Sequence, residues 1–462
     1  MLRAKWTKKL IYLLPVMLLV DSLCFGCGSS ETEAMAESVS ENAMPEMVSV
    51  SVNDDTVSDN MPTDDSAKDV STVSGNMQAD GFAGDIGTVS GNMQDGLDED
   101  VTVEDTRRQP VKVKGIYVSG PAAGIAKMDD LIDLVDQTEL NAMVIDIKND
   151  EGKVTYKMQS EQVLEIDAGV RYIPDIEELV VKCKEKDIYL IARIVAFRDP
   201  YLAEQKPEWA LHTKSGEIFR DKNGMAWVNP YCHEVWDYLV EIASESAQAG
   251  FDEVQFDYIR FSTDIGEGEV DYGPEAENVD KIQIITEFTE YLYEKLVPQG
   301  VYVAADVFGT VIDNKADQAI VGQDYVQMAT HLDYICPMVY PSHYYRGSYE
   351  IKVPDAEPYR TINAAALASV EVLSTVPEEN RAHVRLWLQS FTASWVSGHI
   401  SYGPEQIRAQ IKGAYDAGYD EWILWNAAAN YQFDAFLTEE EAEEERLRWD
   451  AEKLAAVEAD AE

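Results

Sequence analysis

The sequence contains few residues of the kinds that bind metals or form disulfides. It has 5 cysteines and 6 histidines among its 462 residues. Cys24 and Cys27 lie near the amino terminus, and the other three cysteines, Cys183, Cys232 and Cys336, are far apart and odd in number. The cysteine positions do not fit a disulfide framework, and the histidines do not have the paired spacing of a catalytic zinc site. We therefore expect buried, unpaired thiols and no metal or other cofactor.

Basic residues are also scarce. The chain has 37 Lys and Arg against 85 Asp and Glu, which gives a formal net charge of −48. Because nucleic-acid binding needs a basic surface, this charge excludes nucleic acid as an expected partner. The sequence also lacks a Gly-rich phosphate loop and a Gly-x-Ser-x-Gly nucleophile elbow. Nucleotide chemistry and serine hydrolase chemistry are therefore disfavoured.

The first residues form a targeting segment. Basic residues precede an apolar run from Leu10 to Val20, which is too short for an ordinary membrane-spanning helix. The run leads into Cys27 and resembles a bacterial lipoprotein signal over residues 1–27, which implies a lipid on the Cys27 sulfur. We therefore predict an extracytoplasmic protein attached to the cell membrane by this lipid anchor, with plain secretion as the alternative.

Residues 28–110 are predicted to be a disordered acidic linker. Between residues 28 and 105 there are 19 Asp and Glu, one Lys and a single aromatic residue. Such a segment cannot bury enough apolar surface to offset its chain entropy. It contains a repeat with a period of 16 residues, at 56–61, 72–77 and 88–93, which we interpret as a duplicated spacer.

Residues 111–437 alternate between strand-like and helix-like patterns. Eight such units predict a (β/α)₈ barrel, also called a TIM barrel. A doubly wound sheet is the alternative, but the first strand is not followed by the Gly-rich fingerprint of that fold. The Glu- and Ala-rich residues 438–462 are predicted to be an acidic carboxy-terminal tail. The strands are expected at 114–120, 141–150, 188–197, 251–261, 301–309, 333–340, 383–391 and 419–426.

Two carboxylates near the ends of neighbouring predicted strands are the candidate catalytic pair. Asp257 belongs to the fourth strand and Asp306 to the fifth. Adjacent strands lie about 4.8 Å apart, so the two carboxyls could act on one bond, with Asp257 as nucleophile or base and Asp306 as acid. Asp146 is the main rival for the second role, and Glu217 is a weaker candidate. A purely structural ion pair between Asp257 and Arg260 is the competing interpretation.

Other polar and aromatic residues near the strand ends indicate a carbohydrate substrate. Amides and charged groups bind vicinal hydroxyls, and aromatic faces stack on the apolar faces of pyranose rings. Each aromatic residue could instead be a packing residue between the barrel and its helices. The predicted substrate-binding residues are Asp146, Lys148, Arg193, Asn229, Gln255, Arg260, Tyr340, Gln389, Trp425 and Asn426.

Five segments of the predicted barrel carry a resemblance to a known family. They are 114–117, 144–148, 251–261, 305–309 and 336–344. Over residues 112–437 the chain resembles the putative glycosyl hydrolase domain family of secreted bacterial barrels. This resemblance implies a TIM barrel and glycoside hydrolase activity.

A more distant resemblance is to the α-amylase-like glycosidases, which place an aspartate nucleophile after the fourth strand and an acid after the fifth. This sequence differs in having Gln255 where those enzymes have Arg, and Asp306 where they have Glu.

We therefore predict a glycoside hydrolase that acts on a polysaccharide or cell-envelope glycan. The alternative is a non-catalytic glycan-binding or envelope-structural barrel, since a fold does not determine a function. Nothing in the sequence indicates an oligomeric state.

Overall fold

The computed structural model describes residues 110–266 and 268–460, with side chains described as far as residue 455. The predicted signal segment, 1–27, with its lipidation residue Cys27, lies outside the described residues. Nearly all of the predicted linker, 28–110, lies outside them as well, so both remain predictions. Of the helices that are described, none is long and apolar enough to span a membrane.

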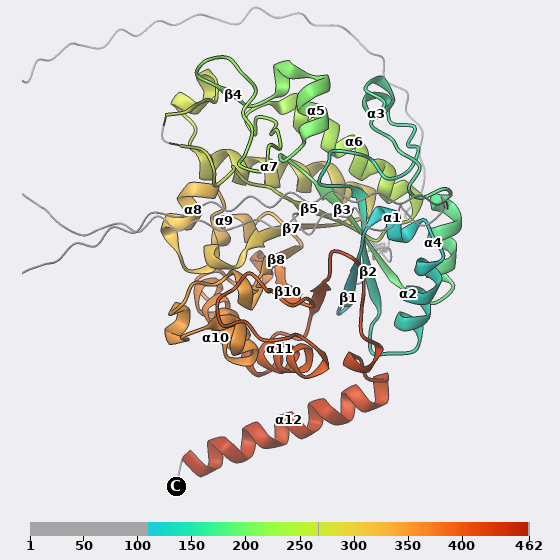
Figure 1. Ribbon diagram of the computed structural model, residues 1–462, viewed down its shortest axis with the longest axis vertical. Coiled ribbons are helices and arrows are strands. Elements are labelled where there is room, and N and C mark those ends of the chain that lie inside the picture. Colours follow the sequence, from blue (N-terminus) through green and yellow to red (C-terminus); the bar gives the residue numbers. More distant parts are fainter. Residues whose placement is uncertain (1–109, 267, 461–462) are drawn as a thin grey trace, which may run out of the picture. The chain divides into compact units, whose positions relative to one another are not determined.

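The centre of the described region is a closed parallel β-barrel, which confirms the predicted (β/α)₈ fold (Figure 1). Strand β11 pairs with β1 and so closes the cylinder. Strands β9 and β10 together form one of the eight barrel positions, interrupted at Arg385. In barrel order the strands are β1 (Lys114–Val118), β2 (Ala142–Lys148), β3 (Tyr189–Val195), β5 (Glu253–Asp257), β7 (Tyr302–Phe308), β8 (Tyr334–Met338), β9 (His383–Val384) with β10 (Leu386–Gln389), and β11 (Trp422–Trp425).

Helices follow the strands and surround the sheet (Figure 1). Two short strands, β4 (His212–Thr213) and β6 (Val270–Asp271), pair with each other outside the barrel. The α-helices are α1 (Gly120–Ala123), α2 (Lys127–Asp136), α3 (Glu161–Glu165), α4 (Ile176–Lys184), α5 (Pro200–Gln205), α6 (His233–Ala249), α7 (Lys281–Leu296), α8 (Lys315–Val321), α9 (Tyr325–Ala329), α10 (Pro358–Leu373), α11 (Pro404–Ala417) and α12 (Glu439–Asp460).

Helix α7 illustrates why the sequence forms these outer helices. The Asp280 side chain accepts a hydrogen bond from the backbone N–H of Gln283 at 2.8 Å and caps the first turn. Ile284, Phe288 and Leu292 are buried and recur every four residues, so one face of α7 is apolar. This face packs on the outside of the sheet, and the opposite face meets solvent.

The alternation of side chains along the strands divides the core into two layers. On β2, Met143 and Ile145 belong to the layer between sheet and helices, whereas Val144 belongs to the layer inside the barrel. Ile191 and Ala304 join Val144 in the inner layer. Because side chains on a strand alternate between its two faces, Asp146 on β2 and Asp306 on β7 also point into the barrel.

A buried charge cluster lies inside the barrel near the amino-terminal ends of the strands. The Arg385 guanidinium contacts carboxylate oxygens of Glu253 at 2.7 Å and Glu421 at 3.0 Å. Tyr189 donates its hydroxyl hydrogen to Glu253 at 3.2 Å. Burial raises the pKa of Glu253 to about 7 although Arg385 opposes the shift. No pattern in the sequence predicts this cluster.

Replacing Arg385 by Met is expected to destabilise the protein. The change leaves two carboxyl groups without their shared cation in a site where Arg385 and Glu253 are 0% exposed. Breaking a buried ion pair in this way costs roughly 3 kcal/mol or more of the free energy of unfolding, measurable by chemical denaturation. Arg360→Met is the control, since Arg360 forms an exposed pair with Glu357 and its loss costs less than about 1 kcal/mol. Equal unfolding midpoints for the two variants would contradict the expectation.

Candidate functional site

Five predicted site residues meet inside the barrel near the carboxy-terminal ends of β2, β3, β5 and β7. Arg193 is paired with Asp146 on one side and with Gln255 on the other in the register of the sheet. Phe256 pairs with Ala305, so Asp257 and Asp306 are the next residues of two adjacent parallel strands. The structure therefore places this pair side by side at one end of the barrel, where Asp257 is 6% exposed and Asp306 is 1% exposed.

Arg193 links three carboxylates. Its Nε and Nη2 atoms donate to Oδ2 of Asp257 at 3.1 and 2.6 Å. Its Nη1 atom donates to Oδ1 of Asp146 at 2.7 Å, and longer bonds of 3.4 Å reach Asp150. The guanidinium fork is suited to such multiple contacts. The negative charge of Asp257 is thus held by a fixed cation.

Asp306 has a different environment, with no cation in direct contact among the described residues. Its Oδ1 atom accepts hydrogen bonds from Gln255 Nε2 and Trp387 Nε1, each at 2.6 Å. Burial and the negative charge of Asp257 raise the pKa of Asp306 well above its ordinary value, and these two hydrogen bonds oppose the rise. The two neighbouring carboxyl groups therefore lie in different environments, Asp257 beside a cation and Asp306 without one in direct contact, an arrangement typical of a partner carboxylate and an acid.

Asp146 also has an unusual carboxyl group. The Tyr117 hydroxyl donates to its Oδ2 atom at 2.5 Å, while Arg193 donates to Oδ1. Burial raises the pKa of Asp146 to about 6, although the Arg193 charge opposes the shift. Both of its oxygens are engaged by side chains, so Asp146 is less free than Asp306 to donate a proton to a substrate.

The chain turns sharply directly after Asp257. We expected the strand to continue to residue 261, but β5 ends at Asp257, so that expectation was wrong. Tyr258 has a φ of +54°, a left-handed conformation that is unfavourable for a residue with a large side chain. Its backbone N–H donates to Oδ1 of Asp257 at 2.6 Å. Backbone strain of this kind is often found at functional sites.

Aromatic rings surround the carboxylates. Tyr117 and Trp425 have ring centroids 4.1 Å apart, and the Arg193 guanidinium lies 5.3 Å from the Trp425 ring. Burial raises the pKa of Tyr340 well above its ordinary value, and the charges of Asp306 and Asp257 add to this rise. Tyr340 packs in the inner layer of the barrel with Trp387, which donates to Asp306.

The remaining predicted substrate-binding residues contact neighbouring protein groups. Lys148 is fully buried and forms an ion pair of 2.8 Å with Asp199. Arg260 lies over the Phe308 ring, and among the described residues it forms no direct ion pair with Asp257. The amides of Asn229, Gln389 and Asn426 donate to the carbonyls of Tyr272, Phe391 and Ser390. Whether these residues also contact a substrate remains a prediction.

Three residues of the site were not on the predicted list, namely Tyr117, Asp150 and Trp387. A signal existed for Asp150, because it lies an even number of residues after Asp146 and so shares its side of an extended chain. No comparable signal existed for Trp387, which reaches Asp306 from a strand two positions away around the barrel.

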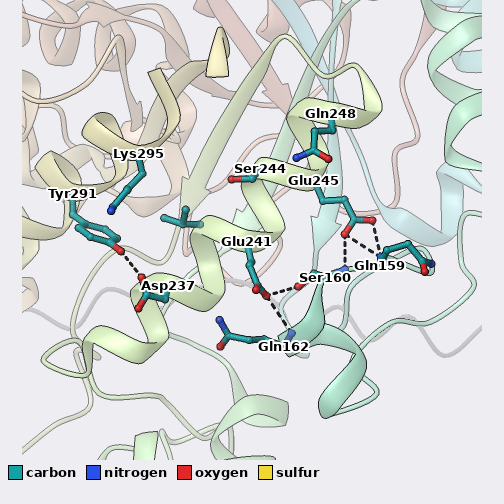
Figure 2. Close-up of a pocket in the computed structure, with 11 residues that line it drawn as sticks. Gln159, Ser160, Gln162, Asp237, Glu241, Ser244, Glu245, Gln248, Tyr291 and Lys295 are labelled. Atoms are coloured by element: carbon teal, nitrogen blue, oxygen red, sulfur yellow. Dashed lines mark hydrogen bonds between the residues drawn. The ribbon is translucent and has the colours of Figure 1, made fainter. Parts of the chain in front are cut away.

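A hollow lies among α3, α6 and α7 on the outside of the barrel, away from the carboxyl pair (Figure 2). Its acidic residues have structural partners. Glu245 accepts hydrogen bonds from the backbone N–H groups of Gln159 and Ser160, and Glu241 accepts one from the Ser160 hydroxyl. These carboxylates thus stabilise the start of α3. Over the described part of the chain no group of three or more His, Cys, Asp or Glu side chains is arranged to hold a metal ion.

Comparison with known proteins gives several matches. The family described as "Putative glycosyl hydrolase domain" matches residues 115–431. A hypothetical protein from Ruminiclostridium thermocellum ATCC 27405 is 36% identical over 42% of this chain and 97% of that chain, with a TM-score of 0.39. The PgaB (BpsB) glycoside hydrolase domain from Bordetella bronchiseptica is 14% identical over 69% of this chain and 95% of that chain, with a TM-score of 0.50.

A third structure is more distant. The glycoside hydrolase domain of PelA from Pseudomonas aeruginosa is 10% identical over 70% of this chain and 97% of that chain, with a TM-score of 0.41. No curated protein matches the chain. The likeness to the PgaB domain is one of fold.

Proposed function

The chain belongs to the putative glycosyl hydrolase domain family, and from this premise we propose that it hydrolyses a glycosidic bond in a polysaccharide or cell-envelope glycan. The observation that carries the proposal is the carboxyl pair. Asp257 ends β5 and Asp306 lies two residues before the end of β7, so both are at the same end of the barrel, and of the two only Asp257 has a direct ion pair with Arg193 among the described residues. Two carboxyls with different environments on either side of one bond are what glycoside hydrolysis needs.

In the proposed reaction Asp306 is the acid and Asp257 the nucleophile. Asp306 gives its proton to the glycosidic oxygen as the bond to the anomeric carbon breaks, and a carboxylate oxygen of Asp257 forms a bond to that carbon. Water then attacks the anomeric carbon, Asp306 takes a proton from it, and Asp257 leaves. Strand neighbours about 4.8 Å apart fit the short carboxyl separation of retaining enzymes, roughly 5 to 5.5 Å.

The role of Arg193 follows from its contacts. It holds Asp257 in one orientation through two hydrogen bonds to Oδ2, which supports a fixed direction of attack. It must release part of that interaction as the charge of Asp257 is consumed. Its additional contact with Asp146 keeps the guanidinium in place while this happens.

The sugar would be bound by the aromatic and polar groups around the pair. Trp425 is partly buried and offers a ring face beside Arg193, the buried Tyr340 lies behind it in the same inner cluster, and Arg260 lies beside the turn that follows Asp257. Lys148, Asn229, Gln389 and Asn426 support the same site by fixing the segments that follow the strands. No cofactor takes part in this proposal, in which water is the second substrate.

We place this activity outside the cytoplasm, with the protein attached to the membrane through a lipid on Cys27. The support is the sequence pattern of residues 1–27. The acidic linker, 28–110, would then act as a flexible tether between the anchor and the barrel.

A non-catalytic glycan-binding barrel is the second candidate function. One observation favours it, namely that both oxygens of Asp257 already accept hydrogen bonds, Oδ2 from Arg193 and Oδ1 from the backbone of Tyr258. A carboxylate held this firmly could serve only to shape a binding site. The test is a glycan-panel assay of wild-type protein and Asp257→Asn, in which hydrolysis by the wild type alone supports the enzyme.

Replacing Trp387 by Phe is expected to move the alkaline limb of the pH–activity profile to higher pH. The indole N–H stabilises the ionised form of Asp306, so its loss raises the pKa of this carboxyl. An acid with a higher pKa keeps its proton to higher pH, and the limb follows it. The measurement is kcat against pH for the glycan that the wild type cleaves.

Trp425→Phe is the matched control for this change. It also replaces an indole by a phenyl ring, at a residue whose ring contacts that of Trp387. Among the described residues, however, Trp425 makes no hydrogen bond to Asp306. Its alkaline limb should coincide with that of the wild type. An unchanged or lowered limb in Trp387→Phe would show that Asp306 is not the titrating acid.

A further inference from the structure

Trp395 lies in the segment after β10 and is 57% exposed. A single exposed apolar side chain is normal on a protein surface and indicates nothing by itself. Trp395, however, is stacked on Phe391, with ring centroids 6.0 Å apart and an interplanar angle of 18°. Phe391 in turn contacts Tyr340 edge-on, with centroids also 6.0 Å apart. A row of rings therefore leads from the surface to Tyr340, which belongs to the same inner cluster of the barrel as Trp387, the hydrogen-bond donor to Asp306.

The segment that carries the two outer rings is fixed by hydrogen bonds. Buried Asp355 accepts bonds from Gln389 Nε2 at 3.0 Å and from the backbone N–H of Ile400 at 3.2 Å, so it joins both ends of the segment. Gln389 Nε2 also donates to the carbonyl of Phe391 at 3.0 Å. The Arg346 guanidinium donates to the carbonyl of Ser397 at 2.9 Å.

This anchoring explains what Gln389 does at the strand end. It connects the β10 strand, the Phe391 backbone and Asp355, so the position of Phe391 is coupled to that of the barrel. A ring held in place before a ligand arrives loses little side-chain freedom on binding. The row of rings is therefore preorganised.

We propose that Phe391 and Trp395 form an additional sugar-binding subsite, which continues from Tyr340 and holds a pyranose ring of a glycan chain that extends away from the scissile bond. This inference rests on the proposed function, because the subsite adjoins the inner cluster that contains Tyr340 and Trp387. It goes further in assigning two residues outside the barrel strands that bind the glycan chain beyond the scissile bond.

The chemistry of the row fits such a chain better than a single sugar. The flat faces of Trp and Phe match the apolar faces of pyranose rings, whereas hydroxyl groups at the rim of each sugar remain in water. The two outer rings, Phe391 and Trp395, lie nearly parallel to each other and are not buried, whereas Tyr340 meets Phe391 edge-on and is buried. A monosaccharide placed at the carboxyl pair could not reach Trp395 as well.

The test measures glycan binding in the hydrolysis-deficient Asp257→Asn background by isothermal titration calorimetry. The probes are disaccharides and hexasaccharides of the chito-, cello- and malto-oligosaccharide series. Adding Trp395→Ala should weaken binding of a hexasaccharide roughly 10-fold, the effect of losing one stacked aromatic ring. Binding of the disaccharide of the same series should not change, since it does not extend to Trp395.

Two controls separate stacking from general damage. Trp395→Phe keeps an aromatic face and should retain most of the hexasaccharide affinity. Leu447→Ala removes a side chain of similar exposure, 60%, from α12, which is attached to α11 through the ion pair of Arg408 with Glu445. It should leave affinity unchanged.

The outcomes distinguish the subsite from the proposed function. If a hexasaccharide is bound and hydrolysed but Trp395→Ala binds it as tightly, the subsite is refuted and the hydrolase proposal stands. If Trp395→Ala weakens binding although the wild-type protein hydrolyses no glycan, the subsite stands and the hydrolase proposal fails. If no probe binds to the Asp257→Asn protein or to the wild type, both are refuted.

Discussion

Asp257→Asn is expected to reduce kcat for glycan hydrolysis roughly 10⁴-fold or more, as for the loss of a residue from a catalytic group that acts as a unit. The amide cannot carry the charge that attacks the anomeric carbon. Asparagine also carries an NH₂ group in place of one carboxylate oxygen. If this group takes the Oδ2 position, it removes the acceptor of the two hydrogen bonds that Arg193 donates in the wild type. Binding should persist, because the barrel wall and its rings are unchanged. The measurement pairs kcat from reducing-sugar release with affinity from calorimetry.

Asp324→Asn is the matched control. It makes the same chemical change at a buried aspartate that caps α9 through the backbone N–H groups of Val326 and Gln327. Asparagine is an equally good cap, and losing the ion pair of Asp324 with the exposed Lys315 costs less than about 1 kcal/mol, so stability should change little and turnover not at all. Full activity in Asp257→Asn would exclude its carboxylate as nucleophile. Glycan binding without turnover by both the wild type and Asp257→Asn would favour the binding barrel.

The barrel itself was predictable because its signal is local. Strands with inward and outward residues in alternation, separated by amphipathic helices, repeat eight times along the chain. The short helices α1, α3, α5 and α8 were missed because each has only four to seven residues. Such elements are set by caps and by packing against neighbours, and α3 depends on carboxylates that α6 supplies.

The candidate site was predictable only in part. Asp257 and Asp306 could be brought together from strand order alone, because carboxy-terminal ends of parallel strands meet at one face. The hydrogen bond from Trp387 to Asp306 joins residues 81 positions apart in sequence, and that from Arg193 to Asp257 joins residues 64 apart. Contacts of this kind depend on side-chain lengths and on the curvature of the closed barrel. The sequence does not display either.

The buried cluster around Arg385, at the other end of the barrel, also depends on contacts that the sequence does not display. Glu253 opens β5 and Glu421 directly precedes β11, and carboxylates are seldom buried unless they are paired. They are buried because Arg385 interrupts the seventh barrel position and points between them. A polar residue at a strand end thus indicates a functional site only when its partners leave it able to react.

Replacing Arg193 by Met is expected to lower the free energy of unfolding by about 5 kcal/mol at neutral pH, at the upper end of the effect of breaking a buried ion pair. The reason is that Asp146, Asp150 and Asp257 all lose their shared cation at once. Hydrolysis should also be lost, because Asp257 is no longer held in position. Chemical denaturation and kcat measure the two effects.

The destabilisation in Arg193→Met should depend on pH with a definite sign. Asp146 already has a pKa of about 6 in the folded protein, and removing the Arg193 charge raises it further. A carboxyl whose folded pKa exceeds its unfolded value favours folding at low pH and loses that contribution as pH rises through the folded pKa. The difference in unfolding free energy between wild type and variant should therefore grow as pH is raised from about 5 to about 8.

Two further variants test the cause of this destabilisation, namely Arg193→Lys as a partial replacement and Arg220→Met as a control. Lysine keeps the charge but lacks the planar fork, so it cannot bind Asp146 and Asp257 in the same geometry, and we expect an intermediate loss of stability with low activity. Arg220→Met breaks an exposed pair with Glu204 and should cost less than about 1 kcal/mol. If Arg193→Met were no less stable than Arg220→Met, the three carboxylates would not depend on Arg193. The division of charge between Asp257 and Asp306 would then need another cause.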